Sequence, residues 1–222
     1  MPNEWLEIAS DTCVMVSDTH RFGEDALRLA DFSAPRRRDR VCDLGTGCGA
    51  IALRLCARFS PAAVHGVDIA PDAIALATQA ADAFGGMPTP TFAVGDWNAP
   101  ATVGDAGAYD LVVCNPPYFP PHSGGVSADE ARRLARHEQQ GTMEAVCGAA
   151  ARLLRYGGRF CLCCRPERMV TVLAALTAAR LEPKRIRPVC HRAGDAPWLL
   201  LIEARRGGRP GLVWEPSEED TE

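Results

Sequence analysis

The sequence has no apolar run that approaches the roughly 18 residues a membrane-spanning helix needs. Its first residues, Met-Pro-Asn-Glu-Trp-Leu-Glu, lack the basic and then apolar pattern of a secretory signal. Internal repeats and long linkers are also missing. Charged residues make up 23% and hydrophobic residues 47%, an ordinary balance for a soluble domain. We therefore expect a cytoplasmic protein with a single core and no membrane partner.

A second metal-ligand pair is also missing. Ten cysteines are present, but only Cys161 and Cys164 have the CxxC spacing, and a structural zinc site needs two such pairs or added histidines. In a strand these two side chains would point to opposite faces. Because a secretory signal is lacking, disulfides are not favoured either. We expect free thiols, most of them buried, and no metal.

Lysine is almost absent, with Lys184 the single example, so nearly all positive charge is arginine. Residues 151–211 carry 13 basic and 4 acidic side chains, whereas residues 1–150 carry 11 and 19. A basic segment suits a polyanionic partner such as RNA, or simply a solvated surface. Residues 212–222 hold five acids and no base. This composition predicts that residues 214–222 form a flexible acidic tail.

Apolar segments of strand and helix length alternate along the rest of the chain. Strands are expected at residues 41–44, 63–67, 91–94, 109–114, 159–164, 184–190 and 199–203, and helices at 24–32, 50–59, 71–84, 127–139, 142–154 and 166–180. Such alternation implies right-handed crossovers and a mainly parallel sheet of seven strands with helices on both faces. The last two strands have no helix between them, which predicts one final antiparallel strand. We expect one α/β domain over residues 34–213, preceded by an amino-terminal segment, 1–33.

Each of the first three predicted strands ends in residues suited to a nucleotide cofactor. Asp43 is followed by a glycine-rich turn over residues 45–49, which lets the backbone approach a ligand closely. Asp68 lies 19 residues past that turn, where an acid can accept hydrogen bonds from ribose hydroxyls. Asp96 could accept one from an adenine amine, beside the flat surface of Trp97. These ends of parallel strands meet at one edge of the sheet, where ligands bind.

A nicotinamide dehydrogenase would show similar features, but its G-x-G-x-x-G pattern needs a third glycine where Ala50 stands. An acid at Asp43 also suits an amino group better than a pyrophosphate. The sequence here resembles the S-adenosylmethionine-dependent methyltransferases, whose first motif is D-x-G-x-G-x-G. The resemblance implies a Rossmann-like class I fold, S-adenosylmethionine as cofactor and S-adenosylhomocysteine as product. The cofactor-binding residues it implies are Phe22, Asp43, Gly45, Gly47, Asp68, Ile69, Asp96, Trp97 and Asn115.

The tetrapeptide Asn115-Pro116-Pro117-Tyr118 follows the fourth predicted strand. The lone pair of an adenine or amide nitrogen is delocalised, so this nitrogen is a poor nucleophile. An asparagine oxygen and a proline-fixed carbonyl can accept its two N–H groups and leave the nitrogen free to pyramidalise, and Tyr118 offers a face for stacking. The four residues therefore predict the catalytic site of an amino-methyltransferase. A proline-rich loop that merely ends a strand is the alternative.

The tetrapeptide is what amino-methyltransferases carry, and further segments resemble one branch, the tRNA1(Val) adenine N6-methyltransferases. These segments are residues 18–32, 115–119, 135–138, 165–168 and 182–186. The resemblance implies methyl transfer to the N6 amine of adenine in tRNA. We expect tRNA to be the partner and the basic residues of segment 151–211 to contact part of its backbone. Glutamine methylation of a release factor, guanine-N2 methylation of ribosomal RNA and a non-catalytic cofactor-binding module remain open. Oligomeric state is not predicted.

Overall fold

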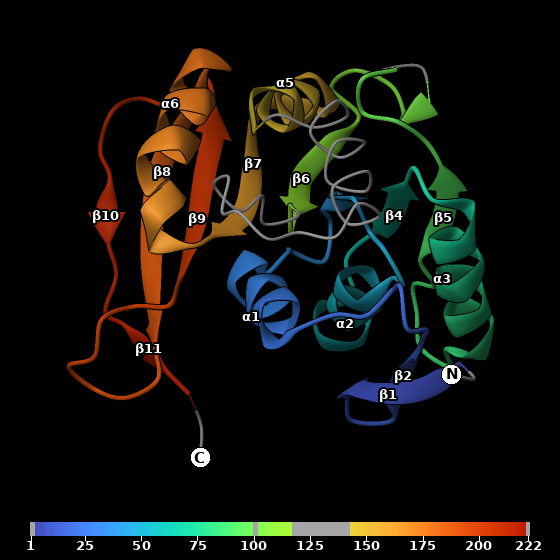
Figure 1. Ribbon diagram of the computed structural model, residues 1–222. Coiled ribbons are helices and arrows are strands. Elements are labelled where there is room, and N and C mark those ends of the chain that lie inside the picture. Colours follow the sequence, from blue (N-terminus) through green and yellow to red (C-terminus); the bar gives the residue numbers. More distant parts are fainter. Residues whose placement is uncertain (1–2, 100–101, 117–142, 221–222) are drawn as a thin grey trace, which may run out of the picture.

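The computed structural model describes residues 3–99, 102–116 and 143–220 of the chain (Figure 1). The strands are β1 Glu4–Ala9, β2 Thr12–Val16, β3 Arg40–Leu44, β4 Ala63–Asp68, β5 Thr91–Val94, β6 Tyr109–Cys114, β7 Leu154–Cys164, β8 Leu181–Cys190, β9 Leu199–Arg206, β10 Val213–Trp214 and β11 Glu218–Glu219. The helices are α1 Glu24–Ser33, α2 Ala50–Phe59, α3 Pro71–Ala83, α5 Met143–Leu153, the 3-10 turn η2 Pro166–Arg168 and α6 Met169–Ala178.

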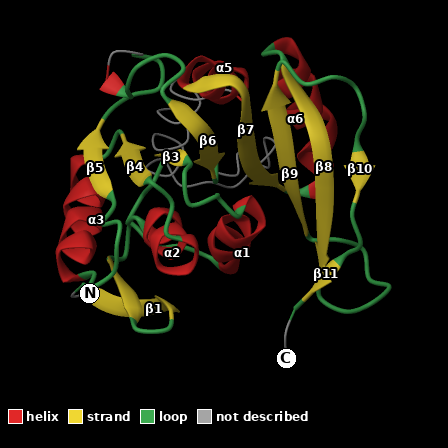
Figure 2. Ribbon diagram, turned by 180° about the vertical axis from the view of Figure 1, so that it is seen from behind, coloured by secondary structure: helices red, strands yellow, loops and turns green. Residues whose placement is uncertain are grey.

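The strands β3 to β9 form the seven-stranded core of one sheet in the order β8-β9-β7-β6-β3-β4-β5 (Figure 2). Neighbours from β5 to β7 are parallel, whereas β9 is antiparallel to both β7 and β8. This confirms the predicted fold class and its single antiparallel strand. The helix expected at residues 127–139 lies outside the described residues.

Both faces of the sheet are covered, and β6 shows how its residues divide between them. Leu111 and Val113 pack in the cluster that includes α1 and α2, while Val112 and Cys114 pack in the cluster that includes α5 and α6. All four side chains are fully buried. Because successive side chains alternate across a strand, a continuous apolar run is what two covered faces require. Figure 1 shows these two helix pairs on opposite sides of the sheet.

All ten cysteines lie in the described residues, are free, and all except Cys13 are buried. On β7, Cys161 and Cys163 belong to the cluster beneath α1 and α2, whereas Cys164 belongs to the opposite cluster. The CxxC pair is therefore split between the two faces, and within the described residues no group of metal-ligating side chains gathers. Likewise, none of the described helices is both long and apolar enough to cross a membrane.

The amino-terminal segment contains a hairpin that the sequence did not predict. Its strands β1 and β2 pair with a bulge between Glu7 and Ala9. Val14, Val16 and Ile8 pack there with residues of α2 and α3. The hairpin covers the lower ends of these helices in Figure 1 and leads the chain into α1.

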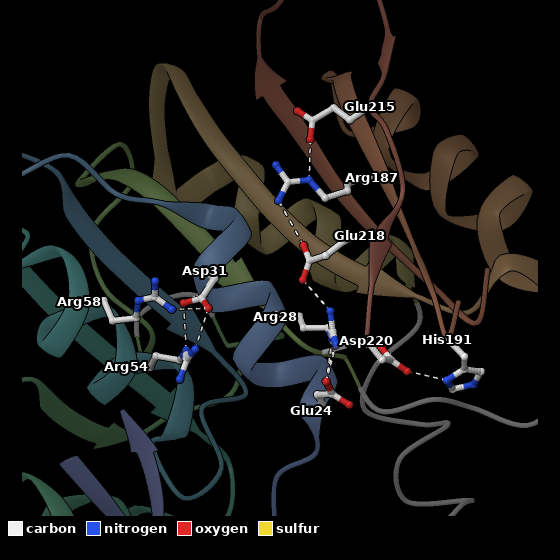
Figure 3. Close-up of polar contacts among 10 residues, drawn as sticks. All are labelled: Glu24, Arg28, Asp31, Arg54, Arg58, Arg187, His191, Glu215, Glu218 and Asp220. Carbon is white, nitrogen blue, oxygen red and sulfur yellow. Dashed lines mark hydrogen bonds and ion pairs between the residues drawn. The ribbon is translucent and has the colours of Figure 1, made fainter. Parts of the chain in front are cut away.

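The carboxyl-terminal segment also differs from the flexible tail that its composition predicts. Strands β10 and β11 each pair with the outer edge of β8. Between them, Glu215 accepts hydrogen bonds from Arg187 (Nε to Oε2, 2.7 Å) and Arg185 (Nη1 to Oε1, 3.1 Å). Glu218 and Asp220 contact Arg28 of α1 (Figure 3). The acids are ordered because the arginines that face them neutralise their mutual repulsion.

Candidate active site

The glycine-rich turn joins β3 to α2. Gly45 and Gly47 have φ of 72° and 54°, a left-handed conformation that residues with a Cβ rarely adopt. A Cβ on Gly45 would also lie 3.4 Å from the ring of Trp97, whereas one on Gly47 would meet nothing within 4 Å. The turn thus combines a position closed by a neighbouring ring with one that opens into free space.

Asp43 lies directly behind this turn and is fully buried. Thr46 Oγ1 donates a hydrogen bond to Asp43 Oδ2 at 2.7 Å. Oδ1 has no hydrogen-bond partner among the described residues. Burial raises the pKa of Asp43 to about 7, although the Thr46 hydrogen bond lowers it. The site therefore holds a buried carboxyl with one oxygen available to a donor.

Asp68 ends β4 and ties the glycine turn to the next helix. Its Oδ2 accepts a hydrogen bond from the Gly47 backbone N–H at 2.8 Å, and its Oδ1 accepts one from the Ala70 N–H at 3.0 Å. Ile69 follows and is 40% exposed. The acid predicted for ribose contact is thus also the acid that fixes the open glycine of the turn.

Asp96 and Trp97 follow β5, as the sequence predicted. Asp96 Oδ1 accepts hydrogen bonds from the backbone N–H and the side-chain amide of Asn98, at 2.8 and 3.1 Å. The Trp97 ring packs against the core cluster beneath α5 and α6 and beside Gly45. Trp97 is therefore partly a core residue that forms a wall next to the turn.

Asn115 follows β6 and lies between two side chains from other elements. Its Nδ2 donates to Asp25 Oδ2 of α1 at 3.2 Å, and its Oδ1 accepts from the Cys163 thiol of β7 at 3.1 Å. Asp25 and Cys163 were not among the predicted site residues. The signal for Asp25 was its place in the first turn of a helix within the motif at residues 18–32, but nothing local indicated its partner.

One pocket of about 240 Å³ joins the glycine turn, the start of α1 and the end of β6. It is lined by Arg21, Phe22, Gly23, Asp25, Ala26, Gly45, Thr46, Gly47, Cys48, Ala50, Ile51, Asn115 and Pro116. Of the predicted site residues, the pocket brings together Phe22, two glycines, Asn115 and Pro116. Asp43, Asp68 and Trp97 lie against the turn, and Ile69 and Asp96 follow β4 and β5, but these five residues do not line this pocket. Pro117 and Tyr118, like residues 135–138, lie outside the described residues.

Several arginines of the basic segment are engaged by acids. Arg185 contacts both Glu203 and Glu215, and Arg187 contacts Glu215 and Glu218. These pairs lower the positive charge that this side of the molecule could offer to a polyanion.

Arg165 is exposed at the end of β7, two residues after Cys163, and its guanidinium lies 5.4 Å from the centre of the Trp198 ring.

Residues 35–192 match a family model described as a methyltransferase domain. The chain belongs to this methyltransferase family. It is 30% identical to a tRNA1(Val) (adenine(37)-N6)-methyltransferase of Tolumonas auensis, over 89% of this chain and 79% of that one. It is also 40% identical to a release factor glutamine methyltransferase of Rhodospirillum rubrum, but over 52% of this chain and only 33% of that enzyme.

Solved structures agree on the fold. A predicted O-methyltransferase of Agrobacterium tumefaciens has a TM-score of 0.70 at 22% identity, covering 88% of this chain and 86% of that one. A geranyl diphosphate methyltransferase in complex with S-adenosylmethionine has a TM-score of 0.57 at 17% identity, covering 82% and 84%. The methyltransferase thus has the class I, Rossmann-like fold.

The chain is an S-adenosylmethionine-dependent methyltransferase, and its own residues fit that cofactor. The cofactor carries an ammonium group, a sulfonium and ribose hydroxyls, so it presents positive charge and hydrogen-bond donors. The pocket has the Asp25 carboxylate in its wall and an open glycine, Gly47, at its edge. The buried Asp43 oxygen without a partner among the described residues lies behind the same turn. Acidic and backbone groups of this kind complement the cofactor.

Proposed function

We propose that this methyltransferase transfers the methyl group of S-adenosylmethionine to the exocyclic N6 amine of an adenine in tRNA. The observation that carries the proposal is the position of Asn115 and Pro116, which follow β6 and line the same pocket as the glycine turn. The relative with the tRNA activity supports the substrate class, because the match covers 79% of its length.

Asn115 and Pro116 supply the hydrogen-bond acceptors that the reaction needs. S-adenosylmethionine supplies a methyl group on a sulfonium. The Asn115 Oδ1 and the Pro116 carbonyl accept the two N–H groups of the target amine, so that its lone pair turns out of the ring plane toward the pocket. No strong base is required, because the amine becomes acidic once it is methylated. Pro117 and Tyr118 are proposed to extend this site by aiming the carbonyl and stacking the base.

The cofactor-binding roles follow the elements that carry each residue. Phe22, Gly45 and Gly47 are proposed to contact the methionine end, where the pocket opens. Asp43, which lies behind the turn, is proposed to act near the same methionine end of the cofactor. Asp68 and Ile69 at the end of β4 are proposed to meet the ribose, and Asp96 and Trp97 after β5 the adenine. In a parallel sheet these strand ends meet at one edge, which supports a single extended cofactor site.

A target adenine inside an RNA loop must leave its stack to reach Asn115. Arg165 follows β7, two residues after Cys163, whose thiol donates to Asn115 Oδ1, and it is proposed to contact the RNA backbone next to the displaced base. The residues 36–40, with four arginines, are a second proposed contact. Such contacts predict an affinity for tRNA that falls with rising salt.

Glutamine methylation of a release factor is the second candidate, and it has an observation of its own. The relative from Rhodospirillum rubrum is 40% identical over 115 residues, a higher identity over a shorter match. An asparagine and a proline carbonyl would hold a glutamine amide in the same way as an adenine amine. The two candidates therefore share the chemistry and differ in the substrate.

The test is transfer of labelled methyl from S-adenosylmethionine to tRNA that lacks its modifications, to ribosomal RNA and to a release factor. We expect N6-methyladenosine from tRNA, and a loss of about 100-fold in Asn115→Ala, as is typical when one preorganised hydrogen-bonding group is removed. Asn3→Ala, an exposed asparagine before β1, is the matched control. Label in the release factor or in ribosomal RNA alone would overturn the tRNA assignment.

A further inference from the structure

Asp25 lies in the first turn of α1, where both of its carboxylate oxygens accept hydrogen bonds. Its Oδ1 accepts a hydrogen bond from the Ala26 backbone N–H at 2.9 Å, while its Oδ2 faces Asn115. The helix dipole favours negative charge in this first turn. A Cβ on Gly23 would lie only 2.6 Å from Asp25 Oδ1. The Asp25 carboxylate therefore fills space that a side chain at residue 23 would occupy.

An ionised carboxylate accepts hydrogen bonds and donates none. The amide group of Asn115 must therefore turn its Nδ2 toward Asp25, as the 3.2 Å contact has it. This orientation places Oδ1 on the opposite side, where the Cys163 thiol donates to it at 3.1 Å. Both partners favour the same one of the two amide orientations, although they come from α1 and β7.

The orientation matters because the two ends of an amide have opposite chemistry. If Oδ1 faces the target amine, Asn115 accepts its N–H; if Nδ2 did, it would repel the same N–H. A carbonyl oxygen has two lone pairs, so Oδ1 can accept from Cys163 and still accept from the substrate. Donation to a negative partner also polarises the amide and strengthens Oδ1 as an acceptor.

We propose that Asp25 is a positioning residue for methyl transfer: through its hydrogen bond to Asn115 Nδ2 it fixes and polarises the amide whose oxygen accepts the target N–H. This rests on the proposed role of Asn115, but not on which amine is methylated. Asp25 also lines the pocket, so a role limited to binding the cofactor is the alternative that the experiment must separate.

The experiment compares wild type with Asp25→Asn, Asn115→Asp and the double variant, measuring kcat, KM for S-adenosylmethionine and affinity for S-adenosylhomocysteine. Asp25→Asn should lower kcat by about 10-fold, the effect of weakening one charge-assisted hydrogen bond, and leave KM and affinity within about twofold. Asn115→Asp should lower kcat further, because two carboxylates then face each other. The double variant should recover at least about tenfold over Asn115→Asp, because the amide at position 25 now donates to the carboxylate at position 115.

An unchanged kcat in Asp25→Asn, or a raised KM with kcat intact, would overturn the proposal, as would a double variant without recovery. Gly23→Ala provides a second route, since it displaces the Asp25 carboxylate without removing it, and should also lower kcat. Gly85→Ala is the matched control: a Cβ there meets nothing within 4 Å. Thermal unfolding of each variant checks that loss of fold is not the cause.

The substrate does not decide this outcome. If wild type methylates a release factor or ribosomal RNA and not tRNA, the tRNA proposal fails, and the same four proteins are compared on the substrate that is accepted. If no substrate is accepted, the side-chain amide resonance of Asn115 in ¹⁵N-labelled protein, assigned by its loss in Asn115→Ala, is the readout. It should move in Asp25→Asn and stay in Gly85→Ala; a resonance that does not move in Asp25→Asn would overturn the proposal.

Discussion

Glu218 of β11 lies 2.6 Å from Arg28 of α1, measured between Oε1 and Nη1, although 190 residues separate them. Arg28 Nη2 also contacts Asp220 Oδ1 at 2.8 Å, and the Arg28 side chain is only 9% exposed. Ion pairs therefore hold the carboxyl-terminal segment against α1, the helix whose first turn lines the active-site pocket (Figure 3).

Removing this arginine should destabilise the protein. In Arg28→Met, the exposed Glu24 and the partly buried Glu218 and Asp220 lose their common cation, so we expect the free energy of unfolding to fall by about 2–3 kcal/mol. Arg58→Met is the control, because the Arg58 side chain is 47% exposed and its pair with Asp31 should contribute less than about 1 kcal/mol. Urea unfolding measures both. Equal losses in the two variants would contradict the anchoring role of Arg28.

The buried carboxyl of Asp43 should make stability depend on pH. Its pKa is raised from 3.8 to about 7, so the folded state binds a proton more tightly than the unfolded state does. Stability should therefore fall as pH rises from about 4 to about 7, by up to about 4 kcal/mol. Asp43→Asn should lose this dependence, so its stability relative to wild type should improve between pH 5 and pH 8. If the stability of wild type relative to Asp43→Asn instead rises with pH, the predicted direction of the pH dependence is wrong.

Two glycines of the turn should respond differently to alanine. A Cβ on Gly49, with φ of 84°, would lie 2.9 Å from the Phe92 ring and 3.1 Å from Ala77 Cβ. Gly49→Ala should thus lose about 2–3 kcal/mol of stability. Gly47→Ala has only backbone strain and should lose about 1 kcal/mol, but its methyl group would face the pocket and weaken binding of S-adenosylhomocysteine. Calorimetric titration and urea unfolding separate the two effects; a Gly47→Ala variant that binds like wild type would argue against cofactor at this turn.

The thiols should differ sharply in reactivity. Burial raises the pKa of Cys161, Cys147 and Cys56 to about 12, so these sulfurs stay protonated and out of reach. Cys13 is exposed on the amino-terminal hairpin. When an aromatic disulfide reagent reacts with the native protein, about one equivalent of the reagent's aromatic thiolate should be released rapidly. After denaturation, about ten equivalents should be released, one for each cysteine. Cys13→Ser should remove the rapid phase; its persistence would mean that a core cysteine is accessible.

The order of strands and helices could be predicted from the sequence, because each depends on neighbours only a few residues away. Residues 111–114 form a continuous apolar run, which requires a strand covered on both faces, and the structure has β6 there. The cofactor class could likewise be predicted, since the glycine turn and the acids that end β3, β4 and β5 are local signals. The hairpin of β1 and β2 was missed although both strands are largely apolar, because each is short and neither shows the regular alternation of polar and apolar residues that marks a strand.

The sequence by itself determined which residues end the strands and so which chemistry gathers at the edge of the sheet: an asparagine and a proline after β6, and glycines after β3. Only the tertiary structure decided which partners those residues meet. Asp25 and Cys163 reach Asn115 from 90 residues before and 48 residues after it, and the acids of residues 215–220 reach arginines on α1 and β8. Composition treats such acids as a solvated tail. Their pairing depends on distances between elements, which are set when the two faces of the sheet are covered.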